Sequence, residues 1–280
     1  MCIRDSSISP VRPPEGADIA APEFPPKMDW LNVAFLRMDR LLGSNAVLIE
    51  FFDTARVNSH RTLPYVQGWD ARYREHGLRT VGVHSPGYSF GRDPGVVERL
   101  AAQMGVRHPV VLDPDFEVWR LYGNRGWPGR YLFDFRGYLR YIHYGEGDYA
   151  GTEAAIAEVL AELDQNFEAP EPLKPIRLED EEGAILEPQT ADIDLPGDRK
   201  RLELSGEWVE GEDWIEAGGP GAAATATFTA GGAWAVLSGA VDPGVYETEG
   251  TVTAEEAGLR LHGFQFTPGP PAPSGSPWGA

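Results

Sequence analysis

The chain is poor in cysteine, in basic residues and in long apolar runs. Its 280 residues include 1 Cys, and 24 Lys and Arg stand against 43 Asp and Glu, which gives a net charge of −19. Binding to phosphate backbones or anionic lipid depends on Lys and Arg, so this balance argues against nucleic acid and membrane surfaces as partners. No run approaches the roughly 20 apolar residues that a membrane-spanning helix needs. We therefore expect a soluble chain without a membrane span.

The one cysteine, Cys2, lies in a start that resembles a technical sequence. Residues 1–6, Met-Cys-Ile-Arg-Asp-Ser, are the translation of a transposase adapter used in DNA library preparation. We interpret residues 1–27 as this adapter-like start followed by an extended, proline-rich lead-in. A genuine leader could then be missing from the sequence. The compartment stays open, with a cytoplasmic location slightly favoured and export as the alternative.

Composition changes along the chain and predicts two domains. Residues 168–268 hold 21 Asp and Glu against 6 Lys and Arg, which leaves 22 against 18 in residues 1–167. Prolines and an acidic run mark residues 166–200 as a linker. Stretches of period two, rich in Thr, Ala, Gly and aromatic residues, predict a small sandwich-like β domain over residues 201–268. Residues 269–280 are expected to be a disordered tail.

Residues 28–165 alternate between strand and helix patterns. We expect strands at 46–52, 78–84 and 109–112, helices at about 59–75, 94–103, 116–122 and 149–164, and a hairpin of 130–134 with 138–143. Alternation of this kind predicts a central sheet with helices on both faces. The late hairpin makes that sheet mixed rather than parallel. The fold class is therefore α/β, followed by the all-β domain.

Several motifs in this region match a known family in order. They are Phe51-Phe52 followed by Arg56 to Val66, then Val81 to Pro86, Asn124 to Pro128, and Gly145 to Tyr149. On these residues the segment from Trp30 to about Leu163 resembles the thioredoxin-like superfamily, most closely the soluble thioredoxin domain of DipZ-type and TlpA-like redoxin proteins. The resemblance implies a thioredoxin fold. It also implies a thiol-disulfide oxidoreductase site at the start of the first long helix.

The resemblance places other residues on both redox cysteine positions. The family carries Cys-x-x-Cys with a proline five residues after the second cysteine; Pro64 is that proline, so Arg56 and Ser59 stand on the cysteine positions. Disulfide exchange needs an attacking thiolate and a resolving thiol. A guanidinium and a hydroxyl supply neither, so we expect a degenerate, redox-inactive site with no catalytic residue and no cofactor. His60 follows Ser59 on the helix and points about 100° away from it, so it should not activate the hydroxyl.

Glu50 falls where the family carries a buried acid under the active site. A remnant of that function would be an internal ion pair between Glu50 and Arg56. Such a pair predicts that Glu50→Gln lowers thermal stability. The alternative is a glutamate at the end of a strand that reaches solvent.

Trp127-Pro128 matches the family's cis-proline position, where neighbouring residues hold an extended peptide. Strand-like pairing with a peptide needs no thiol. Glu50, Arg56, Ser59, Trp127 and Pro128 are therefore the candidate binding residues. Our leading interpretation is a non-catalytic protein that binds a peptide or a protein partner, and a purely structural remnant is the alternative.

Two other functions remain as alternatives. An oxidoreductase or peroxidase-related activity could persist through a partner's thiol. The β domain could bind carbohydrate through Trp208, Trp214 and Trp234, although tryptophans in so small a domain more often pack in the core. The histidines, at positions 60, 76, 84, 108, 143 and 262, have no close spacing that suits a metal, and we expect no metal site.

Overall fold

The computed structural model describes residues 18–184, 186 and 188–269. The adapter-like start and nearly all of the expected tail lie outside these residues. The chain divides into two compact units. The first comprises residues up to 87 together with 91–174, and the second comprises residues 88–90 together with those from 175 onward.

The first unit is built on a six-stranded mixed sheet in the order β1-β4-β3-β2-β5-β6. Its strands are β1 (Trp30–Leu31), β2 (Ala46–Phe52), β3 (Leu78–His84), β4 (Val110–Leu112), β5 (Gly129–Phe133) and β6 (Leu139–Tyr144). Strands β2, β3 and β4 run parallel, whereas β1, β5 and β6 pair antiparallel with their neighbours. The predicted mixed sheet is confirmed.

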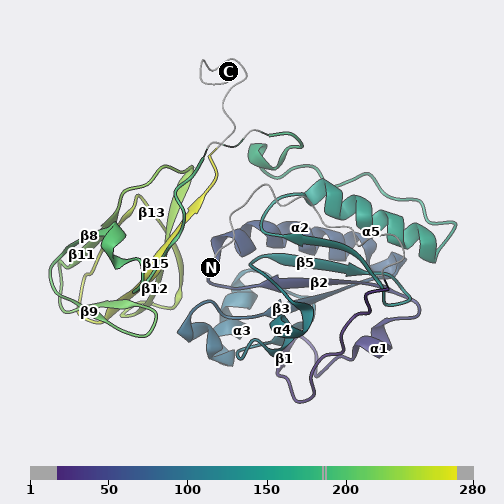
Figure 1. The fold of residues 1–280 in the computed structure, drawn as a ribbon, viewed down its shortest axis with the longest axis horizontal. Coiled ribbons are helices and arrows are strands. Elements are labelled where there is room, and N and C mark those ends of the chain that lie inside the picture. Colours follow the sequence, from purple (N-terminus) through teal and green to yellow (C-terminus); the bar gives the residue numbers. More distant parts are fainter. Residues whose placement is uncertain (1–17, 185, 187, 270–280) are drawn as a thin grey trace. The chain divides into compact units, whose positions relative to one another are not determined.

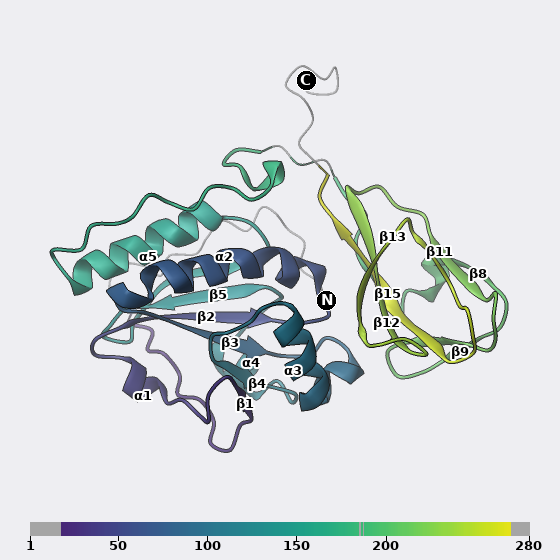
Figure 2. The same ribbon diagram turned by 180° about the vertical axis from the view of Figure 1, so that it is seen from behind.

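Helices cover both faces of this sheet. They are α1 (Met38–Leu41), α2 (Val57–Tyr73), α3 (Pro94–Gln103), α4 (Glu117–Tyr122) and α5 (Tyr149–Leu163). Short 3-10 turns lie at Arg74–His76 and Ser89–Arg92, and at Leu178–Asp180 and Arg199–Arg201 of the second unit. Helices α2 and α5 lie together over one face (Figures 1 and 2), where their side chains form one core cluster with Ala46 and Leu48 of β2. Helices α1 and α4 contribute to the cluster on the other face, with Val47, Ile49 and Phe51.

Side-chain alternation along the buried strand β2 determines to which face its one charged side chain points. All seven residues of the strand are buried. Side chains alternate between the two faces of a strand, so Glu50 shares the α2/α5 face with Ala46 and Leu48. A carboxyl group therefore lies inside the core, on the face that the start of α2 covers.

The second unit is largely antiparallel β structure, as predicted. Its strands are β7 (Ile193–Asp194), β8 (Leu202–Ser205), β9 (Trp208–Glu210), β10 (Ile215–Ala217), β11 (Ala223–Ala226), β12 (Gly232–Gly239), β13 (Gly244–Thr248), β14 (Thr251–Thr253) and β15 (Leu259–Thr267). One sheet has the order β13-β12-β15-β10-β9 with β7 added on β15, and the other is β14-β11-β8. A single apolar cluster, which includes Ile215, Leu261, Phe264 and Phe266, forms the core of this unit.

Both ends of the segment expected as a linker, 166–200, are built into the units. Phe167 and Leu173 pack against the α2/α5 cluster. Ile193 and Leu195 are buried in the core of the second unit. The prolines and acidic residues of this segment indicated a linker, but they gave no sign that apolar residues near its two ends pack into the cores of the units.

Candidate functional site at the start of helix α2

The residues on the two cysteine positions lie at the start of α2, as the resemblance predicts. Arg56 is the N-cap residue, with extended backbone, and the helix begins at Val57. Ser59 is in the first turn. The helix ends at Tyr73 and is followed by a 3-10 turn and by Gly77, which has a φ of 98°. Expectation and structure differ by two residues at each end of this helix.

Arg56 is neutralised by Asp53. The Arg56 side chain is almost buried, with 4% of the residue exposed, and its Nε lies 3.9 Å from Oδ2 of Asp53. The backbone N–H groups of Ala55 and Gly87 donate to the two oxygens of that carboxylate, at 2.9 and 2.8 Å. Burial acts to raise the pKa of Asp53, but the hydrogen bond and charge of His84 and the charge of Arg56 outweigh it, so the pKa is lowered.

The prediction of an ion pair between Glu50 and Arg56 is wrong. The alternative, a Glu50 side chain that reaches solvent, is wrong as well. Glu50 is fully buried and lies opposite Arg130 of β5. Burial, opposed by the charge of Arg130, raises the pKa of Glu50 from 4.5 to about 8. Arg56 lies beyond the end of β2 and pairs with Asp53 in the turn between β2 and α2.

Arg130 and its surroundings form a buried polar cluster that sequence reasoning missed. Its Nη2 donates to the carbonyl oxygen of Gly147, and its guanidinium lies 5.3 Å from the ring centroid of Tyr149. Within the described part of the chain, both oxygens of Glu50 and the Nε and Nη1 atoms of Arg130 have no hydrogen-bond partner. Burial and the charge of Arg130 lower the pKa of the neighbouring His143 to about 3. The sequence held one signal of this cluster, namely Arg130 itself, a charged residue in an otherwise apolar strand.

Ser59 is held as a structural hydroxyl. It is fully buried, and its Oγ accepts a hydrogen bond of 3.2 Å from the backbone N–H of Asp53. His60 instead pairs with the carbonyl oxygen of Thr54, at 2.7 Å. Burial lowers the pKa of His60. This arrangement agrees with the expectation that His60 does not activate Ser59.

Trp127 is the residue that the structure brings to Arg56. The Cζ atom of Arg56 lies 5.3 Å from the centroid of the Trp127 ring, and the Trp127–Pro128 peptide bond is cis, as the resemblance predicts. The indole Nε1 donates to the carbonyl oxygen of Ser85, at 2.9 Å. Arg56, Trp127 and Pro128 therefore come together, whereas Glu50 is placed with Arg130.

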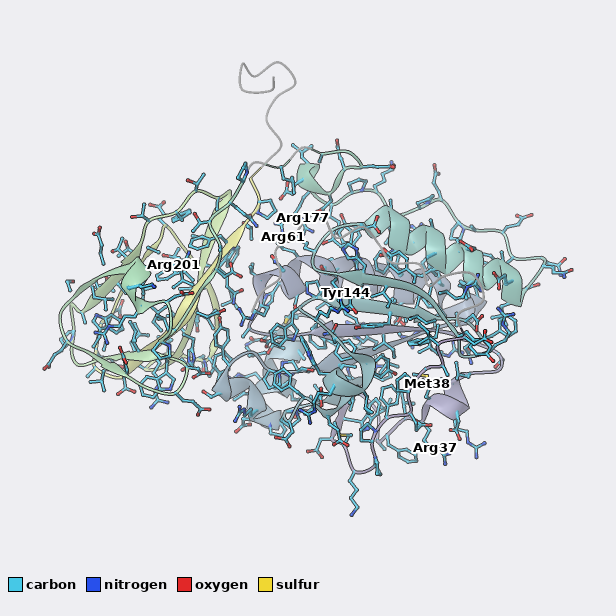
Figure 3. The ribbon with its side chains drawn as sticks, in the orientation of Figure 1. Arg37, Met38, Arg61, Tyr144, Arg177 and Arg201 are labelled. Atoms are coloured by element: carbon cyan, nitrogen blue, oxygen red, sulfur yellow. The ribbon has the colours of Figure 1, made fainter. Side chains whose placement is uncertain are left out.

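The loop that follows β6 is tied to the same helix. Arg61 of α2, one of the side chains labelled in Figure 3, pairs with Glu146 at 2.5 Å. Gly147, next in that loop, supplies the carbonyl that Arg130 binds. The loop thus closes the core over the buried arginine.

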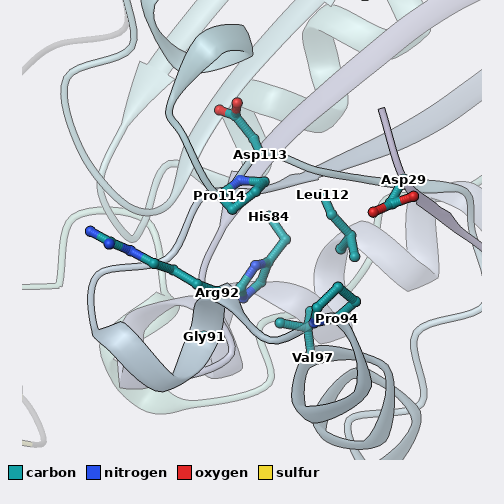
Figure 4. A pocket seen from close by; sticks show the side chains of 9 residues that line it. All are labelled: Asp29, His84, Gly91, Arg92, Pro94, Val97, Leu112, Asp113 and Pro114. Carbon is teal, nitrogen blue, oxygen red and sulfur yellow. The ribbon is translucent and has the colours of Figure 1, made fainter. Parts of the chain in front are cut away.

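A small cavity lies beside the site (Figure 4). Asp29, His84, Arg92, Val97 and Leu112 are among its lining residues, and its volume is about 20 Å³. That is room for about one water molecule. The cavity is too small for a peptide side chain.

Two of the three tryptophans named for the carbohydrate-binding alternative have covered rings. Trp208 is 8% exposed and belongs to the core. Trp214 packs directly against Gly211, and the guanidinium of Arg260 lies 4.4 Å from its ring centroid. Stacking on a sugar needs an open ring face, which these two tryptophans do not offer.

The described residues offer neither a metal-binding cluster nor a membrane-spanning helix. The described residues contain no group of three or more His, Cys, Asp or Glu that could hold a metal ion. No helix among them is long and apolar enough to cross a bilayer.

Three parallel strands, an antiparallel hairpin after a cis proline and a long helix that starts at the edge of β2 define a thioredoxin-like fold. The chain has a thioredoxin-like fold, and it is similar in sequence to thioredoxin-like proteins of the redoxin type. DipZ of Mycobacterium tuberculosis is 36% identical over 172 residues, which are 61% of this chain and 25% of DipZ. YkuV, a thiol-disulfide oxidoreductase of Bacillus subtilis, is 29% identical over 143 residues, 51% of this chain and 95% of YkuV.

This chain spans about a quarter of the length of the DipZ proteins that it matches. Among solved structures, a thiol-disulfide isomerase from Corynebacterium glutamicum is 21% identical, with a TM-score of 0.46, over 50% of this chain and 97% of that one. No protein-family model matches the chain.

Proposed function

We propose that the first unit is a non-catalytic binding protein, in which an extended peptide or protein segment lies against the face formed by Arg56, Trp127 and Pro128. The observation that carries this proposal is the buried guanidinium of Arg56, neutralised by Asp53, where an attacking thiolate would have to stand. Glu50 and Ser59 are fully buried beneath this face. They support it and do not touch the peptide.

The chemistry of the site supports the loss of catalysis. Disulfide exchange proceeds by attack of a thiolate on sulfur and resolution by a second thiol. The only cysteine of the chain is at position 2, outside the described residues. Arg56 has no lone pair to offer at ordinary pH, and the hydroxyl of Ser59 has no base beside it.

The backbone of Trp127 supports retained binding. In the part of the chain that the structure describes, the N–H and C=O groups of Trp127 make no backbone hydrogen bond. An extended peptide can pair with such groups as an added strand does. The indole is 8% exposed; it is held by Ser85 and by the Trp119 ring at 4.6 Å, and it fixes the backbone groups with which a peptide would pair.

An array of unstructured 12-residue peptides tests the proposal. The intact chain should bind a subset of peptides, and Trp127→Ala should weaken that binding by about tenfold or more, as loss of a buried aromatic anchor does. Phe35→Ala is the matched control, because Phe35 is 68% exposed and lies outside the site. Absence of binding by the parent chain, or equal loss in both variants, would contradict peptide binding at this face.

A further inference from the structure

The second unit brings three polar side chains together, two of them on the adjoining strands β12 and β15 and one in the turn between β9 and β10. Oγ of Ser238, near the end of β12, lies 2.8 Å from Nε2 of His262 on β15. Nδ1 of the same imidazole lies 3.1 Å from the carbonyl oxygen of Asp213 and 3.3 Å from its Oδ1. A hydroxyl, an imidazole and a carboxylate in this order are the parts of a nucleophilic serine site.

A β-bulge aims the imidazole at the hydroxyl. In the pairing of β12 with β15, Val236 is opposite Gly263 and Leu237 is opposite Leu261, so that His262 is the extra residue. An extra residue bends its strand and redirects a side chain, and such bulges are frequent next to active sites. Without the bulge, the side chains of β15 would alternate strictly between the two faces of the sheet, and this alternation alone would decide on which face His262 lies.

The carboxylate is itself held in place. The Oγ of Ser89, a residue of the second unit, donates to Oδ1 of Asp213 at 2.9 Å. Burial acts to raise the pKa of Asp213, but the hydrogen bonds from His262 and Ser89 lower it overall. The carboxylate therefore stays ionised and can fix the proton on Nδ1, which leaves Nε2 free to accept the proton of Ser238.

Aromatic rings limit what can reach the site. The rings of Tyr88 and Phe90 lie 5.4 and 5.0 Å from the His262 ring, by centroids. Ser238 is 5% exposed. This burial limits the acyl group that we consider to a small one, and the two rings beside the imidazole suit an aryl leaving group.

We propose that Ser238 is a nucleophilic serine that cleaves aryl esters of small acids, with His262 as its base and Asp213 as a positioning residue. Oγ of Ser238 attacks the acyl carbon while Nε2 of His262 takes the hydroxyl proton. The bond to the aryloxy group breaks, and His262 returns the proton to that oxygen. Water then attacks the acyl-serine with His262 as base, which releases the acid and restores the hydroxyl.

Labelling of the intact chain with a fluorophosphonate tests the site. Attack by Ser238 forms an O–P bond and expels fluoride, and the modified residue is identified by peptide mass spectrometry. We expect the adduct on Ser238, with 4-nitrophenyl acetate hydrolysed and both reactions lost in Ser238→Ala. Ser205→Ala, the same change at an exposed serine on the other sheet, should leave both unchanged.

Asp213 is tested by a matched pair of variants. Asp213→Asn should slow labelling by about a hundredfold, the scale of a misplaced general base, and Asp213→Glu should restore part of the rate at an equal melting temperature. An unlabelled parent chain, or adducts spread over the exposed serines, would overturn the proposal. That outcome would leave the peptide-binding proposal for the first unit untouched, because no residue is shared.

Discussion

At the scale of single residues, the charge of Arg56 at the start of α2 is balanced by a neighbouring carboxylate. A cation at a helix N-terminus is repelled by the helix dipole, and Arg56 occupies that position, almost fully buried. Asp53 offsets the cost, since its carboxylate is fixed by two backbone N–H groups and lies against the guanidinium. The buried acid Glu50, on β2, instead lies opposite Arg130 of β5.

Glu50 should make the stability of the first unit depend on pH. Burial raises its pKa from 4.5 to about 8, so the neutral carboxyl is the form that the fold favours. Its contribution is complete below the unfolded pKa and is lost as pH rises through the folded value. Between pH 6 and pH 8 the free energy of unfolding should fall by about 2 kcal/mol.

Glu50→Gln should remove that dependence, because the amide cannot ionise. The stability of the variant relative to the parent chain should rise by about 2 kcal/mol from pH 6 to pH 8, the opposite of the loss of stability that an ion pair with Arg56 predicted. Urea denaturation at the two pH values measures this, with Glu98→Gln on the exposed face of α3 as the control. A variant less stable than the parent at pH 8 would show that Glu50 is ionised and paired.

At the scale of elements, strands and helices could be predicted and the contacts between them could not. Helix α3 begins at Pro94 and ends at Gln103, as predicted, because capping and periodicity are local. Strand β1 has two residues, too few for any period. Asp53 was missed because its role depends on Gly87, which follows a different strand. The site positions Arg56 and Trp127 came from family motifs, whereas their contact came from the fold.

The loop after β3 should tolerate no side chain at Gly87. A Cβ atom there would lie 2.8 Å from Oδ2 of Asp53 and 2.9 Å from Nη2 of Arg56. Both atoms belong to buried groups, so neither can move without breaking the pair. Gly87→Ala should cost about 2 kcal/mol of stability, as overpacking does.

Gly126→Ala is the matched control, because a Cβ atom would meet nothing within 4 Å there. Chemical denaturation of both variants gives the comparison. Equal stability of the two variants would mean that the loop moves away from Arg56 and Asp53 without cost.

At the scale of the whole molecule, a thioredoxin-like fold stands without cysteine at the two positions where the family resemblance implies redox thiols. The sheet order, the cis proline and the start of α2 are all in place. If the proposed lack of catalysis comes from the missing thiols alone, cysteines introduced at positions 56 and 59 should produce disulfide reduction. The test is made in a Cys2→Ser background, so that no other thiol contributes.

The parent chain should reduce insulin disulfides, with dithiothreitol as electron donor, no faster than dithiothreitol alone. The double variant with Arg56→Cys and Ser59→Cys should accelerate the reduction, because a helix N-terminus lowers the pKa of a cysteine thiol and so favours the attacking thiolate. The nearby carboxylate of Asp53 favours the neutral thiol, so the rate should continue to rise above pH 8. Arg56→Ala with Ser59→Ala controls for the loss of the guanidinium. Turnover by the Cys2→Ser parent would refute a non-catalytic role, since electrons would then be reaching disulfides through a chain that contains no sulfur nucleophile.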